Sequence, residues 1–191
     1  KGFNEKFAPK KSSFCFVNVD SLMGKDCFLA FSSIISLHCE KQTETEVCSK
    51  YISDILNKAK QSLNSNANIE RLMLTVKSIK NLAFNSGFQI LHSVYSNKQN
   101  PLILRIEAVW AVASIQMNGN RTMATKLIQL INDEHEEHEI RVAAFYSLFA
   151  TGATIEELRT VLLNLREKDK KLNSYIYSQR QLLHYISRVS V

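Results

Sequence analysis

One apolar segment of the chain occurs twice, and its spacing predicts a repeated helix. Residues 104–112 (LRIEAVWAV) align without gaps with residues 140–148 (IRVAAFYSL), 36 positions later. A fainter copy occupies residues 72–79 (LMLTVKSI), about 33 positions before the first. Apolar residues recur every three or four positions, which is the spacing of one helix face rather than of a strand. The matched positions are Arg105 with Arg141, Ile106 with Val142, Ala108 with Ala144, Trp110 with Tyr146, and Val112 with Leu148.

Self-similarity at this period is typical of stacked helix pairs. We therefore expect an all-α fold: a right-handed α-solenoid of the HEAT or armadillo kind, with about nine helices in antiparallel pairs. Small Ala108 and Ala144 would let neighbouring helices approach, while the bulky positions beside them fill the seam. The competing explanation is chance likeness between amphipathic helices, and the matched arginine, alanine and aromatic positions count against it.

The remaining polar and apolar positions place the other helices. Residues 1–24 lack clear periodicity and are expected to be an irregular basic lead-in, with residues 25–191 forming the helical superhelix. Residues 167–171 (EKDKK) have the composition of a solvated turn. The apolar stripe of the first helix would be Cys27, Phe28, Phe31, Ile34 and Ile35. The expected helices cover about 26–37, 44–63, 69–84, 88–95, 101–117, 120–131, 139–150, 155–165 and 172–189.

Three helix starts carry recognisable signals. Thr43 with Glu46 fits a capping box, in which each side chain satisfies a backbone N–H of the other residue. Residues 154–157 (TIEE) repeat that pattern. Asn100 followed by Pro101 predicts a cap with proline at the first helical position, where its missing N–H costs nothing.

Composition narrows the class of protein. Hydrophobic residues make up 45% of the chain, while five glycines and two prolines leave little material for turns, which favours helices. No apolar run approaches the roughly 20 residues that cross a bilayer.

The net charge of +6 is not gathered on one helix face, and half of it arises in the first eleven residues, which contain four lysines and one glutamate. A nucleic-acid surface would need a gathered patch, so we expect none. The start at Lys1, without methionine or signal peptide, suggests a piece of a longer protein.

The four cysteines all lie in the first quarter of the sequence, at positions 15, 27, 39 and 48. Four cysteines allow three pairings, and the short spacings that zinc prefers are absent. We favour a disulfide between Cys39 and Cys48, which would staple the loop between two helices and indicates an oxidising compartment. The pairing state of Cys15 and Cys27 stays open.

Most candidate chemistry has a structural explanation. His135 and His138 are three apart in an acidic stretch, whereas a zincin helix needs histidines four apart, so we expect no metal site. No nucleophile motif or phosphate-binding glycine loop occurs, and we expect neither an enzyme nor a bound cofactor. Residues 120–122 (NRT) form an acceptor for N-glycosylation at Asn120. Trp110 and Tyr146 could form a lipid-contacting stripe, but burial between adjacent pairs is the favoured interpretation.

Five segments also carry a family resemblance. Residues 31–35 lead into Cys39 with Cys48 following, and residues 74–82 (LTVKSIKNL), 105–112, 139–145 (EIRVAAF) and 174–180 (SYIYSQR) come after them in order. They resemble the cysteine pair and the "ALKALGNAG", "R-x-x-A-x-x-AL", "PEVRIAAF" and "SFVYSHL" segments of the large lipid transfer proteins. That family includes vitellogenins, insect apolipophorins, apolipoprotein B, the microsomal triglyceride transfer protein large subunit and vitellogenin-like mite group-14 allergens. The likeness spans residues 28–185. His138 departs from the motif's proline, and the glycine turn is delayed to Gly87.

The resemblance implies a place in a larger assembly. The segment would be the later part of a two-layered helical superhelix that curves around sheets enclosing a lipid cavity. The parent would be secreted, carry lipid or serve as a yolk reserve, and this segment would support the neighbouring β-sheet domains. The alternative is an intracellular HEAT-like adaptor that binds protein partners on its concave face. Thiol titration separates the two, since four free thiols favour the adaptor and a Cys39–Cys48 bridge favours the lipoprotein.

Overall fold

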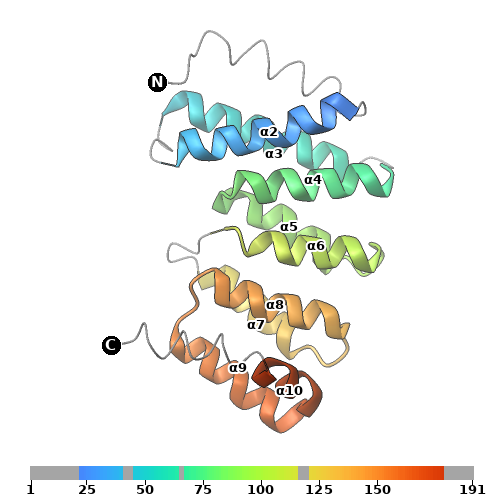
Figure 1. Ribbon diagram of the computed structural model, residues 1–191, viewed down its shortest axis with the longest axis vertical. Coiled ribbons are helices and arrows are strands. Elements are labelled where there is room, and N and C mark those ends of the chain that lie inside the picture. The colour runs from blue at the N-terminus through green and yellow to red at the C-terminus, as the bar shows by residue number, and fades with distance from the viewer. Residues whose placement is uncertain (1–21, 41–44, 65–66, 116–120, 179–191) are drawn as a thin grey trace. The chain divides into compact units, whose positions relative to one another are not determined.

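A computed structural model describes residues 22–40, 45–64, 67–115 and 121–178. Within these ranges it contains nine α-helices, one short 3-10 helix and no strand (Figure 1). This confirms the all-α solenoid that the repeated apolar pattern predicts. The α-helices are α2 (Leu22–Cys39), α3 (Glu46–Asn64), α4 (Ile69–Leu82), α5 (Phe88–Ser96), α6 (Leu102–Val112), α7 (Arg121–Asn132), α8 (His138–Ala150), α9 (Ile155–Lys168) and α10 (Lys170–Ser178).

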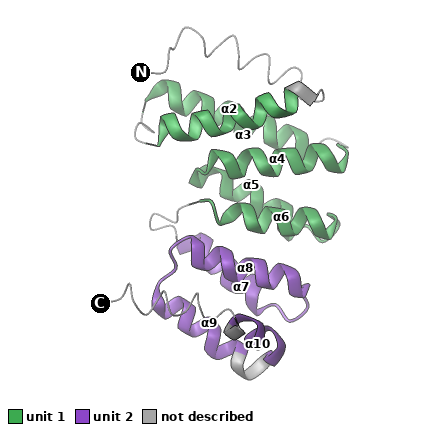
Figure 2. Ribbon diagram, in the orientation of Figure 1, with its two compact units in different colours: residues 1–116 green, residues 117–191 purple. Residues whose placement is uncertain are grey.

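The chain divides into two compact units, residues 1–116 and residues 117–191 (Figure 2). In unit 1, α4 packs between α2 and α6, while α3 packs on α4 and α5 packs on α6. Helices α2, α4 and α6 therefore form one layer, called the even layer, and α3 and α5 form the odd layer. Each hairpin contributes one helix to each layer, as in other α-solenoids, where a hairpin buries its apolar face only against its neighbours.

The core of unit 1 lies between these layers. Ile79, Leu91, Leu104 and Val109 come from three different helices and are fully buried. The short helix η1 (Asn85–Gly87) reaches this core through its glycine. A Cβ at Gly87 would stand 2.6 Å from Cγ2 of Ile79. Glycine is needed there because any side chain would force the turn away from α4.

Unit 2 repeats the hairpin order. Helices α7 and α8 pack together as one hairpin, α9 and α10 form the next, and α9 lies on α7 while α10 contacts α8. Leu127, Leu148, Val161 and Leu172 supply one buried apolar side chain from each of the four helices. A second hairpin is thus required to cover the apolar surface of the first.

Capping side chains define two helix starts as the sequence predicts or nearly so. At α9 the expected capping box is present: the Thr154 hydroxyl accepts from the Glu157 N–H at 3.3 Å, and the Glu157 carboxylate accepts from the Thr154 N–H at 2.8 Å. At α3 a different threonine from the predicted one caps the helix. Thr43 lies outside the described residues, and the hydroxyl of Thr45 accepts from the Cys48 N–H at 3.3 Å.

The start of α6 corrects another prediction. Pro101 has an extended backbone and is the N-cap residue, not the first helical residue. Asn100 does not cap this helix. Its side-chain amide donates instead to the Val94 carbonyl at 2.8 Å, in the last turns of α5. The amide therefore satisfies the C-terminal end of the preceding helix, where carbonyls lack intrahelical donors.

Three predicted boundaries or faces also differ from the structure. Helix α2 begins at Leu22, so the helical region starts inside the expected irregular lead-in of residues 1–24. Ile34, expected on the buried stripe of this helix, is exposed. The helix expected to reach residue 117 ends at Val112. Residues 179–189 of the last expected helix lie outside the described residues.

Candidate functional site

Arg105 is one of two repeated arginines, and it lies buried in unit 1 with 4% of its surface exposed. Its Nε donates to the Tyr95 carbonyl at 2.7 Å. Tyr95 occupies the last turn of α5, where carbonyls lack intrahelical donors and the helix dipole favours a positive charge. Arg105 therefore joins the two helices of its own hairpin: from α6 it donates to the C-terminal end of α5.

Arg141 makes the same contact in unit 2. Its Nε donates to the Ile131 carbonyl at 2.8 Å, in the last turn of α7. Each arginine binds a carbonyl ten positions before it, so the two hairpins share one bracing geometry. The bridging contact expected of a repeated arginine is present at both positions. Its contribution to stability stays a prediction.

Arg141 also reaches the next hairpin, through a residue that the sequence interpretation missed. Its Nη1 lies 2.6 Å from Oδ2 of Asp169, between α9 and α10. Oδ1 of Asp169 accepts from the Leu172 N–H at 2.9 Å and so caps α10. This backbone donor, followed by Arg141 and the charge of His138, lowers the pKa of Asp169 despite partial burial. The expectation that residues 167–171 are simply a solvated turn is wrong for Asp169.

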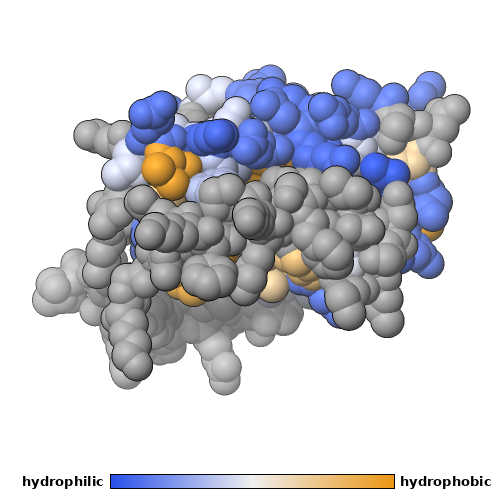
Figure 3. Space-filling model, turned by 90° about the horizontal axis from the view of Figure 1, so that it is seen from above, coloured by the Kyte–Doolittle hydropathy of each residue, from blue (hydrophilic) through white to orange (hydrophobic). Residues whose placement is uncertain are grey.

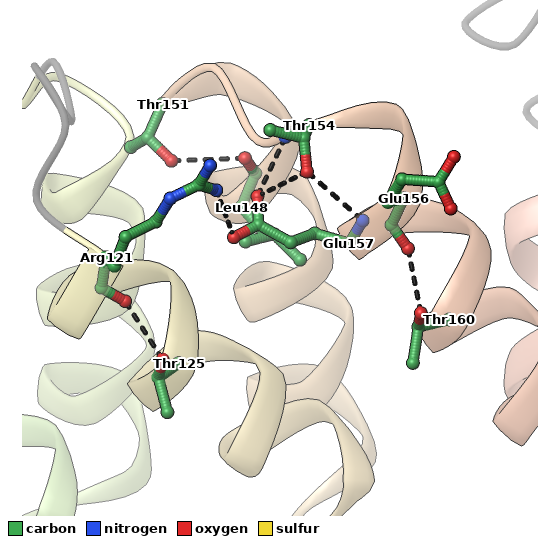
Figure 4. A network of polar contacts seen from close by, with 8 residues as sticks. All are labelled: Arg121, Thr125, Leu148, Thr151, Thr154, Glu156, Glu157 and Thr160. Carbon is green, nitrogen blue, oxygen red and sulfur yellow. Dashed lines mark hydrogen bonds and ion pairs between the residues drawn. The ribbon is translucent and has the colours of Figure 1, made fainter.

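A second polar cluster joins α7 to α9 in unit 2 (Figure 4). Nη1 of Arg121, in the first turn of α7, lies 2.7 Å from Oε1 of Glu157, in the first turn of α9. Partial burial opposes ionisation of Glu157. The hydrogen bonds from Thr154 and the contact with Arg121 outweigh it, so the pKa of Glu157 is lowered.

The other repeated positions separate into buried and surface residues. Ala108 and Ala144 are fully buried in their helices, where a small side chain lets neighbours approach. Trp110 is 37% exposed, so the interpretation that it is buried between helix pairs is wrong. Tyr146 is half-buried and forms a hydrogen bond with Tyr175 of α10; burial first, then Tyr175, raises the pKa of Tyr146.

A disulfide joins Cys39, at the end of α2, to Cys48, in the first turn of α3. Both cysteines are buried. The rings of Phe31 in α2 and Tyr51 in α3 pack edge to face between the same two helices, with centroids 5.7 Å apart. Cys27 is disulfide-bonded as well. The remaining cysteine, Cys15, and the candidate glycosylation site Asn120 lie outside the described residues.

The two histidines of the acidic connection lie in different local environments. His135 is exposed before α8, whereas His138 is the first residue of α8 and packs edge to face with Tyr175 at 6.3 Å between ring centroids. Among the described residues, no group of three or more potential ligands is placed to hold a metal ion. None of the described helices has the length and apolarity needed to cross a membrane.

The two outer faces of unit 1 differ in polarity. Most exposed positions of α3 and α5 are polar, and Val47 in the first turn of α3 is the only large apolar residue exposed there. The even layer, by contrast, exposes Leu37 to 76%. Figure 3 shows hydrophilic side chains gathered along one edge of the described surface. The exposed large apolar residues of the even layer, called the apolar face, are Ile34, Leu37, Ile69, Leu102, Ile103 and Trp110.

The described residues thus combine buried arginine contacts within the hairpins with exposed large apolar residues on the even layer of unit 1. The sequence profile described as Vitellogenin TPR domain matches residues 13–179. The chain therefore belongs to the vitellogenin TPR domain family. This description names tetratricopeptide rather than HEAT or armadillo repeats. All three are stacks of helical hairpins, and a tetratricopeptide period of about 34 residues suits the observed spacings.

Two curated relatives extend this assignment. Vitellogenin-2 of Gallus gallus is 23% identical over 161 residues, and Vitellogenin-1 of Fundulus heteroclitus is 22% identical over 168 residues. The alignments cover 81% and 85% of this chain but 8% and 10% of the relatives. The chain thus spans about a tenth of their length. No solved structure matches the chain significantly.

Proposed function

We propose that this chain is a structural segment of a secreted lipid-transport or yolk-storage lipoprotein. Its role is to support the sheets that hold the lipid, and it carries out no reaction of its own. The observation that carries this proposal is the apolar face of unit 1. Six large apolar residues are exposed on α2, α4 and α6, whereas the facing layer is polar. Exposed apolar residues that gather into a patch mark interaction surfaces, and we propose that these six residues form one.

The family and the disulfide support this proposal. The two curated relatives are vitellogenins, a class of protein that the sequence resemblance includes, and this supports the proposal. The Cys39–Cys48 bond requires an oxidising compartment, which suits a secreted parent and not an intracellular adaptor. In the proposed arrangement the apolar face packs against the parent's own β-sheet domains, and α3 and α5 face solvent.

Charge substitutions on the apolar face test the proposal in the full-length secreted product of the gene. Leu37→Glu and Ile103→Glu would each place a carboxylate in a surface that we propose to be covered, at a high desolvation cost. We expect both to lower the amount of secreted protein and its lipid content, measured as lipid mass per protein.

The matched control lies on the polar layer. Ser53 is exposed on α3, so Ser53→Glu introduces the same charge at an exposed position of the polar layer. It should leave secretion and lipid content unchanged. If all three variants kept the lipid content of the wild type, the scaffold role would be rejected. If all three lost lipid to the same extent, the two faces would not differ.

A further inference from the structure

The seam between the two hairpins of unit 2 carries a charge pattern that packing alone does not require. Both cations, Arg121 and Arg141, belong to the α7–α8 hairpin, and both anions, Glu157 and Asp169, belong to the α9–α10 hairpin. The ion pairs measure 2.7 and 2.6 Å. Arg121 begins α7 and Arg141 lies in the first turns of α8, so the two pairs hold opposite ends of an antiparallel hairpin.

Each anion also starts its own helix. Glu157 accepts from the Thr154 N–H in the capping box of α9, and Asp169 accepts from the Leu172 N–H at the start of α10. The same carboxylates therefore define where α9 and α10 begin and where they dock. If the two ion pairs break, Glu157 and Asp169 lose their arginine partners. Both helix starts depend on these two carboxylates.

The α9–α10 hairpin buries Val161 and Leu172, but it packs less extensively on α7 and α8 than those two helices pack on each other. The described part of helix α10 covers nine residues, fewer than an isolated helix needs to be stable in water. Helix α9 leaves Ile155 and Leu163 exposed, so part of its apolar surface contributes nothing to docking. Elements with limited burial open locally at lower free energy than the core.

We infer that α9 and α10 open and close as one local unit, clipped onto α7 and α8 by two ion pairs at opposite ends of the seam. The Arg141–Asp169 clip is the more buried one, with exposed side-chain fractions of 7% and 19%. His138 adds a further basic group facing Asp169. In the Arg121–Glu157 clip the arginine is 67% exposed, so salt reaches this pair more readily.

The inference is tested by hydrogen–deuterium exchange on the full 191-residue chain carrying Glu157→Gln and Asp169→Asn together. Both replacements keep an amide oxygen that can cap the helix, and asparagine caps about as well as aspartate. They remove only the charge that meets the arginines. We expect amides of α9 and α10 to exchange roughly tenfold faster or more, as for a loss of about 1.4 kcal/mol, while α7 and α8 keep their protection.

Glu156→Gln is the matched control. It removes a carboxylate from the same first turn of α9, at an exposed position with no ion pair among the described contacts. It should leave exchange unchanged. Unchanged exchange in the double variant would overturn the inference, and so would equal acceleration in all four helices, because the unit would then open as a whole. Should the double variant fold poorly, Glu157→Gln alone and the wild type in 1 M salt provide the same comparison for α9.

Discussion

At the scale of single residues, the buried arginines account for how each hairpin is closed. A buried cation is costly unless it is hydrogen-bonded, and the carbonyls that end a helix need donors. Each arginine meets both requirements at once. Arg105 in α6 donates to the last turn of α5, and Arg141 in α8 donates to the last turn of α7.

Replacing Arg105 with methionine should destabilise the chain measurably. Arg105→Met keeps much of the side-chain volume but removes the donor, which leaves the Tyr95 carbonyl without this partner in a buried setting. The expected loss is about 1–3 kcal/mol of unfolding free energy, measured by urea denaturation followed by helical circular dichroism. Lys77→Met, at an exposed position of α4, should change stability by no more than about 0.5 kcal/mol. Equal urea midpoints for Arg105→Met and Lys77→Met would contradict a stabilising role of the Arg105–Tyr95 hydrogen bond.

The sequence could indicate the arginines but not all of their partners. Arg105 and Arg141 are visible because they recur in matched apolar frames, and their repetition predicts a bridging role. Asp169 is not visible in this way, because it stands among lysines and a glutamate in a stretch typical of a solvated turn. Its contact with Arg141 depends on two chain segments 28 residues apart meeting in space. Spacing along one helix carries no information on that encounter.

At the scale of helices, short-range signals predicted where elements exist better than where they begin. The capping box at Thr154 is present because both partners lie within one turn of chain. The prediction failed at Pro101, where the Asn100 side chain binds the preceding helix instead of the following one. Exposure was also mispredicted at Ile34 and Trp110, since helical periodicity identifies an apolar stripe but not whether a partner covers all of it.

The disulfide between α2 and α3 is expected to contribute to this level of structure. It closes a short loop, with a sequence separation of nine, and for such a loop the chain-entropy estimate is about 2–3 kcal/mol. Replacing Cys39 and Cys48 together with alanine should lower the unfolding free energy by about that amount in denaturant titrations. Adding reductant to the wild type should bring its midpoint close to that of the variant or below it, because the bond at Cys27 breaks too. A variant as stable as the oxidised wild type would show that the staple is dispensable.

At the scale of the whole molecule, the polar surface of α7 has a consequence for modification. Helix α7 of unit 2 exposes Arg121, Thr122, Thr125 and Gln129, all polar. A helix with such a surface suits solvent, as we propose for α3 and α5 of unit 1. An N-linked glycan is bulky and tolerated only on a solvent-facing surface of a secreted protein. The acceptor at Asn120 lies directly before this helix in sequence, and the hydroxyl-bearing residue of the acceptor, Thr122, is exposed.

We therefore expect Asn120 to be glycosylated when the chain passes through a eukaryotic secretory pathway behind a signal peptide. Treatment with a glycan-removing amidase should increase its mobility on a denaturing gel, and the peptide containing residue 120 should show the mass change of conversion to aspartate. Asn120→Gln and Thr122→Ala should each abolish the shift, because the acceptor needs both residues, whereas Thr125→Ala on the same exposed face should keep it. An unmodified secreted chain would count against α7 facing solvent. A glycan at this position would exclude this end of α7 as a surface that packs against the parent's sheets.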